Sequence, residues 1–135
     1  MTTASKTTYI YGLGRRKAAT ARARLFKGKG EITINDKPAL DYLSGNKSYL
    51  AEITDPLALT QKQKDYNISI RVSGGGLAGQ VDAIKLAISK ALQTEAPDLR
   101  PVLKKAGFVK RDPREKERKK YGLRSARKKE QFSKR

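Results

Sequence analysis

The last 28 residues of the chain are the feature that most limits how it can fold. Residues 108–135 hold 13 Lys or Arg and 4 acidic residues, a net charge of +9. Their apolar residues are Phe108, Val109, Tyr121, Leu123, Ala126 and Phe132. A segment with so much net charge and so few apolar residues cannot bury enough surface to offset the entropy lost on ordering. We therefore expect residues 108–135 to form a basic, extended tail that becomes ordered on a partner.

The tail also carries signals for limited local order. Asp112 and Pro113 suit the N-cap and first position of a helix, and Glu115 completes a capping box. This pattern predicts a short helix near residues 113–120, marginal by itself because it has only two turns. From Leu123 onward no apolar period is present, and we expect an extended segment.

Residues 1–107 have the patterns of a globular domain. Alternating or β-branched stretches predict strands at residues 9–11, 18–26, 31–34 and 66–72. The turn sequence of residues 27–30 predicts that the second and third of these strands form an antiparallel hairpin. Pro38 suits the start of a short helix over residues 39–43, whereas residues 47–65 read as part helix and part loop.

The clearest helix follows the glycine run at residues 74–76 and stops at Pro97. Its apolar residues fall on one stripe, formed by Leu77, Val81, Ile84, Ile88 and Ala91. A second helix over residues 99–106 ends at Gly107. The sequence thus predicts a small α/β domain of the two-layer α+β kind, with helices packed on a sheet.

Charge points to the kind of partner. The whole chain has 31 Lys or Arg against 13 Asp or Glu, a net charge of +18. Like charges repel within a compact protein, whereas a polyanion neutralises them and releases its counterions. Nucleic acid is therefore the expected partner. No apolar run approaches the roughly 20 residues that span a bilayer, and the first residues do not resemble a secretory signal, so we expect a cytoplasmic protein without a membrane partner.

Cysteine and histidine are both missing from the sequence. Disulfides, the common zinc sites and the usual nucleophile–base pairs of enzymes are thereby excluded. We expect no metal, no cofactor, no small-molecule substrate and no catalytic activity.

The glycine run at residues 74–79 matches the pattern of dinucleotide-binding folds and lies between a strand and a helix. No strand is predicted after the helix, so the βαβ unit of those folds is incomplete, and Gln80 stands where a P-loop has Lys. We interpret the run as a turn that lets the helix pack closely on the sheet. The bare amides of Gly74, Gly75 and Gly76 at a helix N-terminus also suit an RNA phosphate.

Basic residues gather at the start of the domain, where the first 30 residues contain eight Lys or Arg and no acid. Three of them follow Gly12 and Gly14 on an expected flexible turn, and two alternate along the next strand and should share a face with the first three. A merely solvated surface usually mixes both signs of charge. We therefore predict phosphate contacts for Arg15, Arg16, Lys17, Arg22 and Arg24.

The tail supplies the second set of predicted RNA contacts. Aromatic residues Tyr121 and Phe132 lie among its cations and could stack on bases. Fully extended, the tail would reach on the order of 90 Å, far beyond a domain whose radius of gyration is roughly 13 Å, which suits a large RNA assembly. The predicted RNA-binding residues here are Lys110, Arg111, Arg118, Lys119, Lys120, Arg124, Arg127, Lys128 and Lys129.

Three segments of the sequence resemble one family. They are GLGRRKAATARA at residues 12–23, GGGLAGQVDAIKLAISKAL at residues 74–92, and YGLRSARK with QFSKR within residues 121–135. The three segments occur in the same order in the bacterial type of the small-subunit ribosomal protein nine family, and the chain resembles that family over essentially its whole length.

The resemblance implies helices packed on a four-stranded sheet in a structural protein of the small-subunit head, bound to small-subunit rRNA beside neighbouring head proteins. It also implies that the tail reaches peptidyl-site tRNA, where Ser133, Lys134 and Arg135 would contact the anticodon stem. Cytoplasmic and organellar ribosomes are both compatible with it. Charge alone leaves an alternative, a general nucleic-acid compacting or chaperone protein, which would bind duplex DNA as well and stay out of the small-subunit peak in a sucrose gradient.

Overall fold

A five-stranded mixed sheet forms one layer of the domain. The structure is a computed structural model and describes residues 8–132 of the chain. Its strands are β1 (Ile10–Arg16), β2 (Ala19–Lys27), β3 (Ile32–Ile34), β4 (Lys37–Pro38) and β5 (Tyr66–Ser73), in the order β1-β2-β5-β3-β4. All neighbours are antiparallel except β3 and β5, which run parallel.

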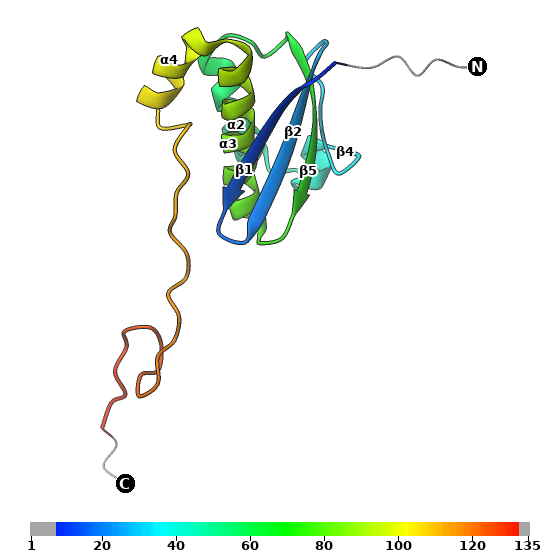
Figure 1. Cartoon of the computed structure of the whole chain (residues 1–135). Helices are drawn as coiled ribbons and strands as arrows, with labels where there is room; N and C mark the ends of the chain where they lie inside the picture. Colours follow the sequence, from blue (N-terminus) through cyan, green and yellow to red (C-terminus); the bar gives the residue numbers. More distant parts are fainter. Residues whose placement is uncertain (1–7, 133–135) are drawn as a thin grey trace, which may run out of the picture.

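Helices form the second layer. They are α1 (Ala39–Tyr42), α2 (Lys47–Leu59), α3 (Leu77–Glu95) and α4 (Arg100–Lys105), with a 3-10 turn η1 (Pro97–Leu99) before α4. Figure 1 shows α2, α3 and α4 gathered on one side of the sheet, and the tail leaving the domain from the end of α4. The predicted class, helices packed on a sheet, is confirmed.

The core lies between α3 and the inner face of the sheet. Strand β2 alternates buried and solvent-facing residues along its length, and α3 packs across β1 and β2. The predicted apolar stripe of α3 is buried at Val81, Ile84, Ile88 and Ala91. The predictions for this helix and for the strand at residues 66–72 are therefore confirmed.

The predicted hairpin between the second and third strands is wrong. Strand β5 lies between β2 and β3, antiparallel to the first and parallel to the second. The side chain of Asn67 on β5 explains the arrangement, because its Oδ1 accepts hydrogen bonds from the amides of Lys29, Gly30 and Glu31 at 2.8, 3.1 and 3.1 Å. The turn at residues 28–30 thus passes over the end of β5, and the chain does not return along β2.

The flexible turn expected at residues 12–17 is also shorter than predicted. Strand β1 continues to Arg16, which pairs with Ala19 of β2, so that only Lys17 and Ala18 form the turn. Gly12 and Gly14 lie inside the strand beneath α3, where an added Cβ would come within 2.0 and 1.9 Å of helix carbonyl oxygens. These glycines let the helix and the sheet approach closely.

The glycine run before α3 is a turn, as predicted. Gly74 and Gly75 have φ of +74° and +68°, values that favour glycine. A Cβ on Gly74 would lie 2.5 Å from the carbonyl oxygen of Ala18, so the turn also packs on the β1–β2 hairpin. In the described chain α3 is followed by η1 and α4, not by a strand, which confirms that the βαβ unit is incomplete.

Pro38 and the region after it differ in detail from expectation. Pro38 ends the two-residue strand β4 and is the residue before α1, which adds a fifth strand to the four expected. Residues 47–59, read as ambiguous, form α2, whose N-cap Asn46 accepts hydrogen bonds from the amides of Ser48 and Tyr49. The second predicted helix is present as η1 and α4, ending before Gly107 with φ of +81°.

The tail does not contain the helix predicted near residues 113–120. Residues 111–120 have no helical structure. Asp112 does accept a hydrogen bond from the Arg114 amide at 2.9 Å, as an N-cap would. However, its carboxylate also binds two guanidinium groups. A helix of about two turns is marginal by itself in water, so these ion pairs can hold the segment in a non-helical conformation.

The segment after Gly122 is not uniformly extended, contrary to expectation. Gly122 has φ of +76°, and Leu123 forms an isolated antiparallel bridge with Lys129. The amide of Arg124 donates to the carbonyl of Lys128 at 2.8 Å. Local backbone bonds of this kind need no apolar period, and the lack of such a period was the reason for expecting an extended segment.

Candidate nucleic-acid interface

The outer face of the sheet, away from the helices, is basic. Arg15 on β1 and Arg22 and Arg24 on β2 are exposed there, because side chains on a strand alternate between faces. The prediction that Arg22 and Arg24 share a face with the preceding cluster therefore holds for Arg15. Exposed Lys17 lies at the hairpin turn, beside the end of this face.

One further arginine on this face was missed by the sequence analysis. Arg71 on β5 is exposed and lies directly opposite Arg22. Like charges in that position destabilise a strand pair, and Arg71 forms a 3.0 Å ion pair with Asp36. The alternation of residues 66–72, with Ile68, Ile70 and Val72 facing inward, already held the signal that Arg71 faces outward.

Arg16 lies on the opposite face from Arg15. Its side chain is only 12% exposed, and its guanidinium is 2.8 Å from Asp112 Oδ1 and 3.4 Å from Asp82 Oδ2. It also donates to the backbone carbonyl of Arg114 at 3.3 Å. The structure thus connects Arg16 to the first residues of the tail, and not to the exposed basic face where phosphate contact was predicted.

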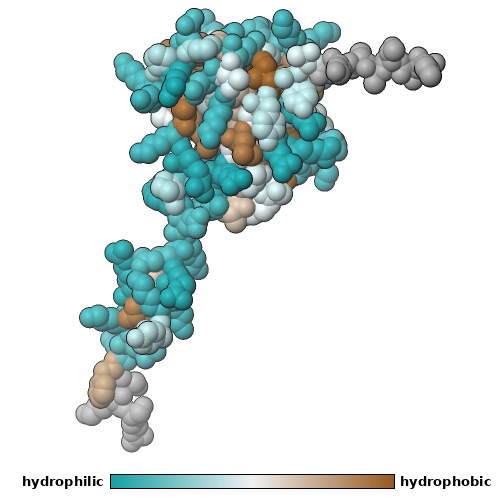
Figure 2. Space-filling model, in the orientation of Figure 1, coloured by the Kyte–Doolittle hydropathy of each residue, from teal (hydrophilic) through white to brown (hydrophobic). Residues whose placement is uncertain are grey.

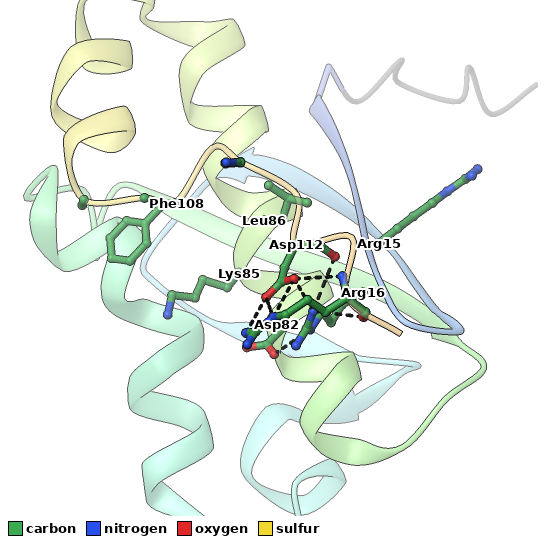
Figure 3. Close-up of a pocket in the computed structure, with 11 residues that line it drawn as sticks. Arg15, Arg16, Asp82, Lys85, Leu86, Phe108 and Asp112 are labelled. Atoms are coloured by element: carbon green, nitrogen blue, oxygen red, sulfur yellow. Dashed lines mark hydrogen bonds and ion pairs between the residues drawn. The ribbon is translucent and has the colours of Figure 1, made fainter. Parts of the chain in front are cut away.

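The junction between domain and tail is a cleft of about 300 Å³ next to α3. Figure 3 shows Arg16, Asp82 and Asp112 pointing toward one another, while Arg15 points away from them. On the other side of the cleft, Lys85 Nζ lies 4.9 Å from the centre of the Phe108 ring, a cation–π distance. Phe108 and Val109 pack against the core, so the first residues of the tail are held by apolar as well as ionic contacts.

Asp112 is the acid on which this junction depends. Hydrogen bonds from Arg114 are the largest effect on it, and the charges of Arg114 and Arg16 add to them, so the pKa of the Asp112 carboxyl lies well below its usual range. The same contact raises the pKa of Arg114. We refer to Arg16, Asp82, Asp112 and Arg114 as the junction cluster.

The turn at residues 74–76 exposes its backbone at the end of the sheet where the turn between β1 and β2 lies. Gly74, Gly75 and Gly76 are exposed, and Gly76 is the N-cap of α3. The side chain of Gln80 fixes the turn, since its Nε2 donates to the Gly74 carbonyl at 3.0 Å and its Oε1 accepts from Tyr42 Oη at 2.8 Å. The amides at this helix N-terminus can bind an anion.

The tail exposes most of its cations. All the predicted tail contacts between Lys110 and Lys129 are exposed. Lys120 and Arg127 both bind Glu117 at 3.0 Å, and these two contacts lower the pKa of the Glu117 carboxyl. Ion pairs between exposed groups contribute little to stability. The predicted tRNA contacts Ser133, Lys134 and Arg135 lie outside the described residues.

Residues 8–132 hold neither a candidate metal site nor a candidate membrane span. No group of three or more potential metal ligands was found there. None of the helices in that range is both long and apolar enough to cross a bilayer.

Comparison with known proteins decides the family. The model of the family described as "Ribosomal protein S9/S16" matches residues 14–135. The chain belongs to this family. The resemblance found in the sequence is thus confirmed, and the protein is a ribosomal protein, a structural component and not an enzyme.

Relatives within the family are similar over their full length. The chain is 50% identical to the small ribosomal subunit protein uS9 of Crocosphaera subtropica, an alignment that covers 98% of each chain. It is also 50% identical to the uS9 proteins of a Synechococcus strain, over 100% of both chains, and of Solidesulfovibrio magneticus, over 94% of this chain and 97% of the relative. The matches include the tail, so both parts of the molecule belong to the family pattern.

Proposed function

We propose that this structural constituent of the small ribosomal subunit binds small-subunit rRNA through two basic surfaces and contacts peptidyl-site tRNA with the end of its tail. The two surfaces are the outer face of the sheet, with Arg15, Arg22 and Arg24, and the exposed cations of the tail. The observation that carries the proposal is the separation of charges. On the helix side Arg16 is neutralised by acids, whereas the arginines of the outer sheet face and most tail cations remain exposed.

The rRNA contact follows from the cost of this arrangement to the free protein. Arg22 and Arg71 lie opposite each other on neighbouring strands, and Arg24 lies on the same face. A phosphate group between such side chains replaces repulsion by attraction and releases counterions. Lys17 at the hairpin turn and the amides of residues 74–76 extend the surface that a folded RNA backbone could contact.

The tRNA contact is an inference from the tail. Figure 1 shows the tail running away from the domain after α4, and the junction cluster fixes where it starts. The tail can therefore place its last residues far from the site where the domain binds. We assign the tRNA contact to Ser133, Lys134 and Arg135 because the family resemblance implies it and because two of the three are cations.

The proposed partners are small-subunit rRNA, peptidyl-site tRNA and neighbouring proteins of the subunit head. The proposed location is the ribosome in the bacterial cytoplasm, and an organellar ribosome would use the same surfaces. Neither surface needs a cofactor, since phosphate recognition requires only fixed cations and amide donors.

Deletion of Ser133 to Arg135 tests the tRNA contact. We expect small subunits that carry the shortened protein to assemble normally and to lose peptidyl-site tRNA faster in a filter-binding assay. Arg135→Glu should lower retention more than Arg135→Ala, because it adds repulsion from tRNA phosphates. Deletion subunits that retain tRNA as well as the wild type would refute the tRNA role while leaving rRNA binding intact.

A further inference from the structure

The basic face of the sheet also displays aromatic rings that phosphate binding does not explain. Tyr9 and Tyr11 are 44% and 47% exposed, and Phe26 beside them is half-buried. Tyr11 and Phe26 lie on the outer face of β1 and β2, and Tyr9, the residue before β1, lies beside Phe26, whereas the core lies on the inner face. Packing of the domain therefore gives no reason for large rings at these positions.

The rings form an ordered array with Arg24. The Tyr9 and Phe26 rings are 5.6 Å apart with an interplanar angle of 57°, and the Arg24 guanidinium carbon lies 5.1 Å from the centre of the Tyr9 ring. Tyr11 is the cross-strand partner of Arg24. Side chains two residues apart in an extended chain are about 6.8 Å apart, so Tyr9, the residue before β1, and Tyr11 present neighbouring rings where this strand begins. We call Tyr9, Tyr11, Arg24 and Phe26 the aromatic array.

Cations continue along the same two strands. Beyond Tyr11 on the outer face, β1 carries Leu13 and then Arg15, and Arg22 on β2 lies opposite Leu13. One end of the face is thus aromatic and the other end is cationic. Figure 2, in the orientation of Figure 1, shows apolar surface on the domain interspersed with hydrophilic side chains, whereas most of the tail surface is hydrophilic.

We propose that the aromatic array stacks unpaired bases of RNA while Arg15 and Arg22 hold the phosphates of the same strand. This inference rests on the proposed rRNA binding and deepens it, since it specifies single-stranded RNA as the ligand of the sheet. Aromatic side chains and guanidinium planes both stack on unpaired bases. Base pairs inside a helix offer no free face to such rings, so the array distinguishes a loop or bulge from a duplex.

Charge favours RNA over a protein partner on this face. Among the described residues that face outward on β1, β2 and β5, none is acidic, while four are arginines. Asp36, an acid beside this face, forms an ion pair with Arg71 of β5. A protein partner would have to supply several carboxylates at once, whereas every nucleotide of an RNA strand supplies one phosphate and one base.

The test compares binding of the full-length protein to a labelled oligoadenylate and to an abasic strand of equal length, by fluorescence anisotropy. Both strands carry the same phosphates, so the ratio of affinities reports stacking alone. We expect the wild-type protein to prefer the oligoadenylate by at least about fivefold, the lower limit for stacking one base on a ring. Tyr11→Ala and Tyr11→Leu should remove most of this preference, and Tyr11→Phe should keep it.

Three control variants separate stacking from other roles. Arg22→Gln should weaken binding of both strands alike and lower the log–log salt slope by about 0.7. Leu59→Ala changes a side chain of similar exposure (43%) at the end of α2, and it should change neither affinity. Tyr121→Ala removes a fully exposed ring of the tail. In this variant, the preference for oligoadenylate that depends on Tyr11 should remain.

Each outcome decides between proposals. An undiminished base preference in Tyr11→Ala, or a loss that is equal on both strands, overturns stacking on the array. If the abasic strand is still bound with the wild-type salt slope, the proposed phosphate contacts stand even though stacking fails. If Tyr11→Ala instead binds both strands normally but is lost from assembled small subunits, the array faces a neighbouring protein and the inference is wrong.

Discussion

The domain and the tail carry the same net charge, +9 in residues 1–107 and +9 in residues 108–135, yet they solve the resulting repulsion differently. In the domain, 22 buried hydrophobic residues between Ala19 and Leu103 form the core, and the sheet confines exposed arginines to its outer face. In the tail, Tyr121 and Phe132 are almost fully exposed. Charge therefore does not decide which region folds. The supply of apolar residues at regular spacing does.

The junction cluster is where the two solutions meet. Arg16 belongs to the inner face of β1, yet its partner Asp112 belongs to the tail. Because Arg16 has a fixed position on the sheet, its ion pair with Asp112 fixes the direction in which the tail leaves the domain. The comparison predicts that changes to one region should have little effect on the property that belongs to the other.

Truncation after Arg114 is the strongest way to separate the regions. The change removes ten Lys or Arg but none of the buried core residues. If about six of these cations contact phosphates, the affinity for small-subunit rRNA near 0.1 M salt should fall on the order of a thousandfold, and the salt slope by about 4 to 5. Filter binding over a salt series measures both.

The same truncated protein should unfold in urea with a free energy within about 0.5 kcal/mol of the wild type, the range of surface changes. A loss of stability of several kcal/mol would show that the tail is part of the domain. An unchanged salt slope would show that its cations do not contact RNA.

Gly14→Val is expected to produce the reverse result. A Cβ on Gly14 would lie 1.9 Å from the Ala83 carbonyl oxygen and 2.6 Å from the Ala87 amide nitrogen, so α3 would have to move off the sheet. We expect a loss of more than about 3 kcal/mol in the free energy of unfolding, the upper part of the range for overpacked cores. Urea denaturation followed by circular dichroism measures it.

Gly76→Ser is the matched control for Gly14→Val. A Cβ on Gly76 meets no atom within 4 Å, and serine is a preferred N-cap residue. Its stability should equal or exceed that of the wild type. Equal losses in both variants would mean that general glycine flexibility, and not the close approach of α3, explains the result.

Sequence reasoning succeeded where a local period was present. Alternation identified β2 and β5, and the apolar stripe identified α3, because each period repeats over more than one turn or pleat. It failed for the pairing of β3, since the parallel contact with β5 is made by residues about 36 positions apart in the sequence and is supported by the side chains of Asn67 and Asn35, which bind backbone groups equally far along the chain. No local pattern specifies such a partner.

The candidate site shows the same division. Alternation placed Arg22 and Arg24 on one face, and Arg15 was expected beside them as part of a turn. Arg16 was grouped with them because Gly12 and Gly14 were read as a turn, although Gly12, Gly14 and Arg16 themselves follow a period of two and share the inner face. Asp112 was read as an N-cap, since its contact with Arg16 spans 96 positions. The aromatic array was missed because its rings come from two strands.

Loss of the junction cluster should have a third effect, a loss of backbone order that is smaller than the first two effects and confined to the start of the tail. In Arg16→Gln, residues 110–114 lose the ion pair at 2.8 Å, and we expect their backbone order parameters to fall toward those of a flexible segment, below about 0.6. Arg15→Gln, a change of the neighbouring residue on the other face, should leave these order parameters unchanged. Nitrogen-15 relaxation of the two labelled proteins measures them, and equal values in both variants would contradict a specific role for Arg16.

Acid should release the same contact, with a sign fixed by the lowered pKa of Asp112. A carboxyl whose pKa is lower in the folded protein contributes its full effect above its unfolded pKa of about 4 and loses it only as the pH falls through the lower, folded value. The Arg114 amide, which donates to Asp112 Oδ1 at 2.9 Å, should therefore keep its chemical shift down to pH 4 and move well below it. In Asp112→Asn the shift of this amide should not change over the same pH range, because the Asn side chain does not titrate. A wild-type midpoint at pH 4 would mean that Asp112 is solvated and that neither Arg114 nor Arg16 holds its carboxylate.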